Sequence, residues 1–151
     1  MKGNLDVRRD VLALAFHGTL IMLVGFLEGS AYSLAITGRA PPEVVTQWRV
    51  AHLGSISGGL LLLAGSYIAT LIDARSAIWL SRLYVLGGYT FAVAMLLAAL
   101  FGQRGLLPNL PPENLAVLVL YGIGSLSVLL GTVLALWGLR KATHALLKHV
   151  A

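Results

Sequence analysis

A histidine inside a long apolar segment is the first candidate for chemistry in this sequence. His52 follows Trp48 and Arg49, and the apolar run that it joins continues to Ile72. If this run crosses a membrane, an ionisable side chain within it is costly to insert and is a candidate functional residue. A neutral imidazole is a common ligand of metals and of haem iron. The alternative interpretation is a histidine that is hydrogen-bonded to a neighbouring helix.

Small residues follow this histidine. Gly54, Gly58 and Gly59 would leave a shallow, flat recess beside the imidazole. The same residues fit another interpretation, because Gly54-x-x-x-Gly58 and Ser55-x-x-x-Gly59 are patterns of close helix packing in membranes. Such packing is compatible with a cofactor at a subunit interface. Arg49 could hold a propionate by charge-assisted hydrogen bonds, or extend to lipid headgroups.

Two further ionisable residues lie in the first apolar run. His17 is expected at a depth roughly 15 Å from that of His52, given the rise of a helix, so one iron atom cannot easily take both from one chain. We interpret His17 as a structural residue. The alternatives are that it donates a hydrogen bond to a residue of the site, or that it belongs to a site shared with another subunit. Glu28 is the one carboxylate well inside an apolar run and is expected at the depth of His52. It could form a salt bridge with Arg49 or orient the imidazole.

Composition places these residues in a membrane protein. The 151 residues are 58% hydrophobic and only 11% charged, whereas a soluble domain carries about 25% charged residues. Four apolar runs each reach the roughly 20 residues that cross a bilayer as a helix. We therefore predict an all-α integral membrane protein, with a single domain over residues 1–151. Its four helices, antiparallel to their neighbours, are expected to span about 11–36, 44–72, 77–102 and 113–139. The absence of cysteine excludes disulfides and iron–sulfur clusters.

A few residues predict where the helices begin and end. Asp10 is expected to cap the first helix, and Thr37 to lie at its end. The prolines 41–42 suit the first turn of the second helix. Residues 73–76 form a short polar turn, so the second and third helices should be antiparallel neighbours. The basic tail, residues 140–151, is expected to lie on the membrane surface.

The basic residues predict the orientation in the membrane. Eight of the eleven Lys and Arg side chains fall on the side that holds the N-terminus, the second turn and the tail. The positive-inside rule then places both termini in the cytoplasm, for a multi-pass protein of the cell inner membrane. Because the basic residues are scattered at helix ends, the expected partner is membrane lipid and not nucleic acid. The basic residues on the predicted cytoplasmic side are Lys2, Arg8, Arg9, Arg75, Arg82, Arg140, Lys141 and Lys148. Those on the opposite side are Arg39, Arg49 and Arg104.

Four segments occur in order along the chain: FHGTLIM at 16–22, WRVAHLG at 48–54, VLGGY at 85–89 and RGL at 104–106. Together they resemble the styrene oxide isomerase family, with nearly constant spacing over most of the chain. The resemblance implies a homotrimer of four-helix protomers with haem b between them, and His52 as the axial ligand of the iron. It also implies that the ferric iron acts as a Lewis acid on an epoxide oxygen, and that an aldehyde forms by a Meinwald rearrangement.

The chain departs from the family at three polar positions. Gly58, Gly87 and Met95 stand where the family has an asparagine, an aspartate and a tyrosine that position the epoxide. Tyr89 is the best candidate to replace them, because a phenol can donate to the developing alkoxide, and Ser57 is the second predicted catalytic residue. The residues expected to hold the haem are Trp48, Arg49, His52, Gly54, Ser55, Gly58 and Gly59.

Three functions remain open at this point. The leading one is a haem b isomerase that converts a hydrophobic epoxide, such as an aryl epoxide, into an aldehyde. The second is a non-enzymatic haem b protein for electron transfer, sensing or assembly into a complex, which the missing polar residues favour. The third is a cofactor-free structural or transport bundle in which the histidines serve packing.

Overall fold

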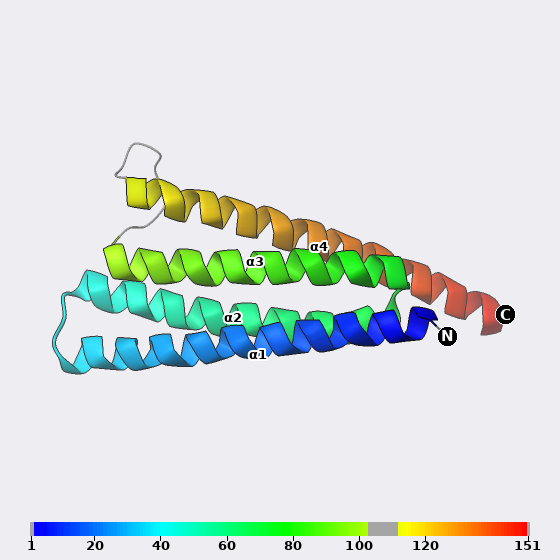
Figure 1. The fold of residues 1–151 in the computed structure, drawn as a ribbon, viewed down its shortest axis with the longest axis horizontal. Helices are drawn as coiled ribbons and strands as arrows, with labels where there is room; N and C mark the ends of the chain where they lie inside the picture. The colour runs from blue at the N-terminus through cyan, green and yellow to red at the C-terminus, as the bar shows by residue number, and fades with distance from the viewer. Residues whose placement is uncertain (1, 103–111, 151) are drawn as a thin grey trace.

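Four long helices follow one another along the chain in the computed structural model, which describes residues 2–102 and 112–150 (Figure 1). They are α1 (Lys2–Thr37), α2 (Pro42–Leu71), α3 (Ala74–Phe101) and α4 (Pro112–Val150). For residues 2–8, 149 and 150 only the backbone is described, and the motif at 104–106 lies outside the described residues. All four helices are long and apolar enough to cross a membrane. The predicted all-α, four-helix membrane architecture is therefore confirmed.

Local sequence explains several helix ends. Pro42 opens α2, where its fixed φ suits the first turn and its missing N–H costs nothing. Asp73 caps α3: its carboxylate accepts hydrogen bonds from the backbone N–H of Ser76 at 3.1 Å and from the Ser76 hydroxyl at 2.7 Å. These hydrogen bonds hold the pKa of the Asp73 carboxyl below its ordinary value. Gly102 ends α3 with a φ of 68°, a conformation that glycine adopts without strain.

Two predicted boundaries were wrong. Asp10 does not cap the first helix, because α1 already begins at Lys2 and Asp10 lies within it. The fourth helix does not end near residue 139, because α4 continues unbroken to Val150, and the place of the tail on the membrane surface stays a prediction. Residues 140–150 contain neither glycine nor proline, so nothing in the sequence ends the helix where the apolar run stops.

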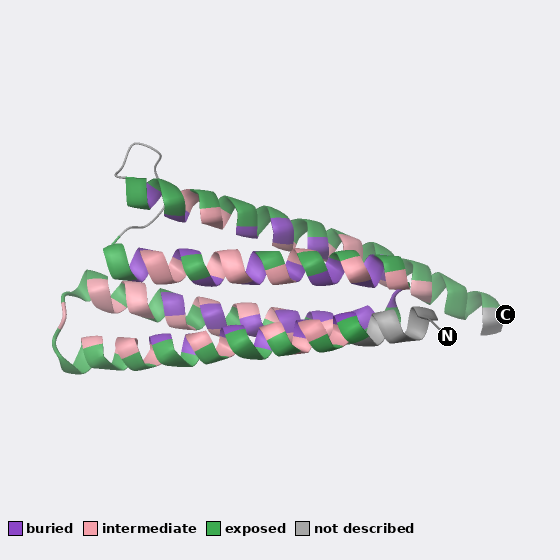
Figure 2. Cartoon of the chain, in the orientation of Figure 1, coloured by how far each residue is buried: buried purple, intermediate pink, exposed green. Residues whose placement is uncertain are grey.

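The helices pack unequally. α1 packs along α2, α2 packs on α3, and α3 also contacts α1. α4 packs along α3, makes only a few contacts with α2, and makes none with α1 among the described residues. Both ends of the chain lie at the same end of the bundle (Figure 1). Buried residues follow the inward faces of the helices, and much of α4 is exposed (Figure 2).

Small residues let the core helices approach closely. The aromatic ring of Tyr84 on α3 lies between Gly65 of α2 and Gly131 of α4: a Cβ at either glycine would come within 2.7 Å of the ring. The Tyr84 hydroxyl lies 3.2 Å from Oγ1 of Thr132, which ties α3 to α4. Leu14, Ile21, Leu62 and Leu80 fill the rest of this layer with fully buried side chains. Packing of this kind, and not a difference in hydrophobicity, holds helices together in lipid.

Candidate functional site

The imidazole of His52 lies between α2 and α1, on a backbone surface that two glycines provide. Its Nδ1 is 2.7 Å from the carbonyl oxygen of Gly25. A carbonyl oxygen only accepts hydrogen bonds, so the proton of this bond is on Nδ1. Gly29 makes room for the ring, since a Cβ there would lie 2.8 Å from Nδ1. The geometry therefore fixes both the position and the tautomer of His52.

This tautomer suits metal ligation. With Nδ1 protonated, the lone pair of a neutral imidazole is on Nε2, which faces away from the Gly25 carbonyl. Ligating histidines commonly have this arrangement, in which the second ring nitrogen donates to a carbonyl or a carboxylate. Among the described residues no group of three or more His, Asp and Glu side chains gathers around a metal position. A single imidazole ligand is what haem iron takes, so His52 fits the haem that the sequence predicts.

Glu28 and Ser55 form a buried polar pair beside His52. Only 2% of Glu28 and 1% of Ser55 are exposed. Glu28 is close enough to both His52 and Ser55 to interact with them electrostatically. Neither its carboxyl oxygens nor the Ser55 hydroxyl has a hydrogen-bond partner within the described chain. Both predicted roles of Glu28 stay predictions, because its oxygens form no hydrogen bond with His52 or with the exposed Arg49.

The predicted recess of glycines beside His52 is filled at Gly54 and Gly59. The side chain of Met95 from α3 occupies the space above Gly54. Gly59 faces α1, where a Cβ would touch the Met22 side chain and approach the Gly18 carbonyl oxygen to 2.6 Å. These two glycines therefore serve helix packing, the alternative that their spacing had left open.

The other residues predicted to hold the haem lie on different faces of α2. A Cβ at Gly58 would meet only Ile21, at 3.8 Å, so this glycine is not closely covered. Arg49 and Ser57 are exposed and Trp48 is half-buried. Ser55 faces inward, toward Glu28. The structure thus brings Ser55 to His52, and leaves Arg49 and Ser57 on the outer surface of the chain.

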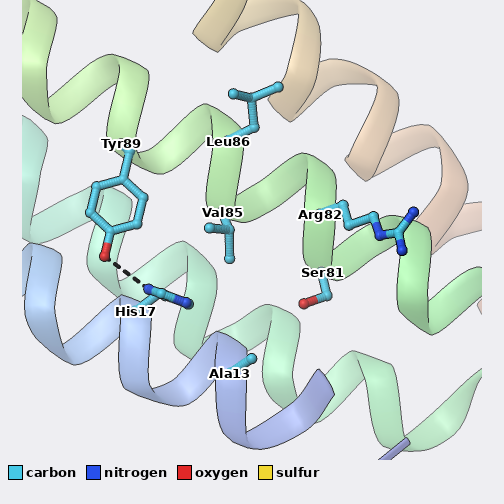
Figure 3. Close-up of a pocket in the computed structure, with 7 residues that line it drawn as sticks. All are labelled: Ala13, His17, Ser81, Arg82, Val85, Leu86 and Tyr89. Carbon is cyan, nitrogen blue, oxygen red and sulfur yellow. Dashed lines mark hydrogen bonds between the residues drawn. The ribbon is translucent and has the colours of Figure 1, made fainter. Parts of the chain in front are cut away.

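His17 and Tyr89 form a second polar pair, apart from His52. Nδ1 of His17 lies 2.8 Å from the Tyr89 hydroxyl, which joins α1 to α3 (Figure 3). Gly29, which touches the His52 ring, is twelve residues after His17 on α1 (29 − 17), or about 18 Å of helix. Within one chain, Tyr89 is therefore not near His52. No sequence pattern links these two residues, because they are 72 positions apart.

One family of known proteins matches most of this chain. A family model described as styrene oxide isomerase matches residues 12–140. The chain belongs to the styrene oxide isomerase family. Neither the search of curated proteins nor that of solved structures finds a match. Family membership indicates a membrane protein of the epoxide isomerase kind, and the matched segment covers the cores of all four helices.

The structure also shows what replaces two polar residues of the styrene oxide isomerase pattern. Gly87 lies against α4, where a Cβ would be 2.7 Å from the Val128 side chain and 3.2 Å from the Gly124 carbonyl oxygen. Met95 fills the space above Gly54. Both positions, at which the resemblance described above implies polar residues, are thus used for packing between helices.

Proposed function

We propose that this chain is a membrane haem b protein that isomerises an epoxide to an aldehyde. In this proposal Nε2 of His52 binds the haem iron. The bound ferric haem would supply Lewis acidity toward an epoxide oxygen. One observation carries the proposal: the hydrogen bond from Nδ1 of His52 to the Gly25 carbonyl, which frees Nε2 for a ligand. Membership in the styrene oxide isomerase family supports the reaction class.

The residues around His52 have supporting roles in this proposal. The Gly25 carbonyl holds the imidazole in one orientation, and Gly29 admits the ring between the helices. Glu28 places a buried carboxyl group beside the imidazole. A carboxyl group near a ligating imidazole increases the electron density that the imidazole donates.

The rearrangement needs no proton from the protein. One C–O bond of the epoxide breaks, a hydride moves to the neighbouring carbon, and the oxygen becomes a carbonyl, so all atoms stay in the substrate. The separation of the Tyr89 hydroxyl from His52 within one chain is compatible with this internal transfer. Tyr89 and Ser57 stay predictions as catalytic residues, because they would have to act from another protomer or from the outer face of α2.

The proposal extends to location and assembly. We propose an inner-membrane protein with both termini in the cytoplasm, in line with the positive-inside rule and with the termini at one end of the bundle. A homotrimer would supply the second wall of the haem site, because His52 is only partly covered in one chain. The exposed apolar side chains of α1, α2 and α4 are available both to lipid and to other protomers.

The visible spectrum of the purified protein tests the proposal. We expect a Soret band in wild type from haem-replete cells, and its loss in His52→Ala with the helical content preserved. Addition of styrene oxide, as an aryl epoxide probe, should shift the ferric spectrum and yield phenylacetaldehyde. A colourless wild-type protein, or a Soret band that His52→Ala leaves unchanged, would overturn the assignment of the ligand. A haem-containing protein that forms no aldehyde would refute the proposed isomerase reaction and leave the haem assignment intact.

A specific observation favours a second candidate, a non-enzymatic haem b protein. Gly87 and Met95 hold packing positions where polar groups would hold an epoxide. This candidate predicts a six-coordinate haem with a reversible redox couple and no response to epoxides. A five-coordinate ferric haem together with rapid aldehyde formation would exclude it.

A further inference from the structure

A cavity lies between α1 and α3, away from His52 of the same chain. It measures about 460 Å³ and is lined by Ala13, His17, Ser81, Arg82, Val85, Leu86 and Tyr89 (Figure 3). The His17–Tyr89 pair lies at one end of it, about 12–18 Å along the bundle from the level of His52, whose ring contacts Gly25 and Gly29 of α1. Its other end reaches Arg82, in the half of the bundle that holds both termini. The cavity is therefore separate from the candidate haem site.

The polar groups of this cavity share one chemical property. Every polar side chain in its wall can donate a hydrogen bond, and none of the seven lining residues is a carboxylate. Nδ1 of His17 is occupied by the Tyr89 hydroxyl, and the second ring nitrogen points away from Tyr89 (Figure 3). Ser81 contributes a hydroxyl from a buried position. A ligand that matches this wall must offer hydrogen-bond acceptors.

Arg82 gives the cavity a positive charge at its edge. The guanidinium lies 5.3 Å from the centre of the Trp79 ring, and the residue is exposed. The carboxylate of Asp10, two turns before His17 on α1, is buried and does not line the cavity. Charge-assisted hydrogen bonds from arginine to carboxylate or phosphate oxygens are among the strong polar contacts in proteins. The preferred acceptor is thus an anionic oxygen group.

The rest of the wall is apolar. Ala13, Val85 and Leu86 offer only hydrocarbon, and Leu86 belongs to the exposed surface of α3. A fully water-soluble anion would leave these side chains unmatched. An amphiphile, with an anionic head at Arg82 and Ser81 and a hydrocarbon chain along α3, satisfies both parts of the wall.

We propose that this cavity binds an amphiphile with an anionic oxygen headgroup. Two sources share this chemistry: a membrane-dissolved fatty acid and an anionic phospholipid of the bilayer. Basic residues near the ends of membrane helices commonly bind such headgroups. The anionic site does not depend on His52 as the haem ligand, since His52 does not line this cavity. Laurate binding can therefore fail while haem binding holds, and the reverse.

The test measures binding of radiolabelled laurate to the full chain, purified and delipidated in neutral detergent. We expect saturable binding of one laurate per chain, weakened more than about tenfold by Arg82→Gln, since a charge-assisted hydrogen bond is lost. Tyr89→Phe should weaken binding less, because it removes only the partner of His17. Arg75→Gln is the matched control: this arginine is on the same helix and lines a different cavity. It should bind laurate as wild type does.

Competition identifies the source and tests the need for charge. Dodecanol has the same chain length and no charge, so it should not displace laurate. Displacement by phosphatidylglycerol, but not by phosphatidylcholine, would assign the site to a bilayer phospholipid. Failure of both lipids to compete would assign it to a fatty acid. Equal laurate affinity in Arg82→Gln and Arg75→Gln, or displacement by dodecanol at the same concentrations, would overturn the proposal.

Discussion

The contact between Gly29 and the imidazole of His52 allows a direct test of the proposed ligand. In Gly29→Ala, a Cβ would lie 2.8 Å from Nδ1 and 2.9 Å from Cε1 of His52. Ordinary contact is about 3.5 Å, so the ring must shift by several tenths of an ångström. Because the hydrogen bond from Nδ1 to Gly25 is only 2.7 Å long and holds the ring against the helix, the shift stretches or breaks it.

The expected effect on haem affinity is larger than that on stability. Altering the hydrogen-bond partner of a ligating imidazole lowers metal affinity about 10- to 100-fold. In the same variant, alanine is favoured over glycine in a helix by up to about 1 kcal/mol. This gain offsets part of the cost of the displaced ring. Gly29→Ala should therefore keep its helical fold and lose haem affinity by about one to two orders of magnitude.

Transfer of haem to excess apomyoglobin, followed in the Soret region, measures this affinity, and circular dichroism checks the fold. Gly122→Ala is the matched control, since a Cβ at this helical glycine of α4 meets nothing within 4 Å. The control should hold haem as wild type does. If Gly29→Ala and Gly122→Ala hold haem equally well, the imidazole of the ligand does not lie on Gly29, and the reasoning is refuted.

Three further changes test other contacts. Gly59→Leu forces a side chain against Met22 and the facing backbone. Such overpacking should lower the free energy of unfolding by about 1–3 kcal/mol, and an unchanged midpoint of unfolding in SDS would contradict this prediction. Asp73→Ala should lower the unfolding free energy by about 1 kcal/mol at pH 7 through loss of the cap. Because the hydrogen bonds from Ser76 lower the pKa of Asp73, this stabilisation is present in the charged form. The difference from wild type should shrink as the pH falls through the lowered pKa, and a constant difference would refute the role of the charge. Glu28→Leu removes buried oxygens that have no partner and should raise the thermal midpoint, since each such group costs about 1–3 kcal/mol; a lower midpoint would show that a second protomer or a ligand pairs with the carboxyl.

Much of the fold could be predicted because single residues determine it locally. The length of the apolar runs identified the four spans. Pro42 indicated the start of α2, and the polar residues after Leu71 indicated the turn to α3. The end of α1 at Thr37 was also predicted, but the start of α1 and the end of α4 were not. Residues with ordinary helix propensity follow the apolar run of α4, and a helix continues until a residue or a contact ends it.

The candidate site was predicted less completely, because its geometry depends on which helix each face meets. The sequence alone identifies His52 as the candidate ligand and gives its position along the second apolar run. The contact with Gly25 does not, because it joins residues 27 positions apart through a backbone carbonyl. The same limit applies to Gly54, whose spacing fits a cofactor recess as well as packing, and only the position of Met95 distinguishes the two.

The unequal packing of α4 has a consequence for the assembly of the protein in the cell. A membrane chain is inserted from its N-terminus, so α1 and α2, which pack along one another, can leave the insertion machinery as a finished hairpin. α4 is synthesised last and finds almost its whole partner surface on α3. Until it arrives, the face of α3 around Tyr84 and Gly87 is open to lipid. Proteases that survey unassembled membrane proteins would meet this face first, so the lifetime of a nascent chain depends on how fast α4 docks.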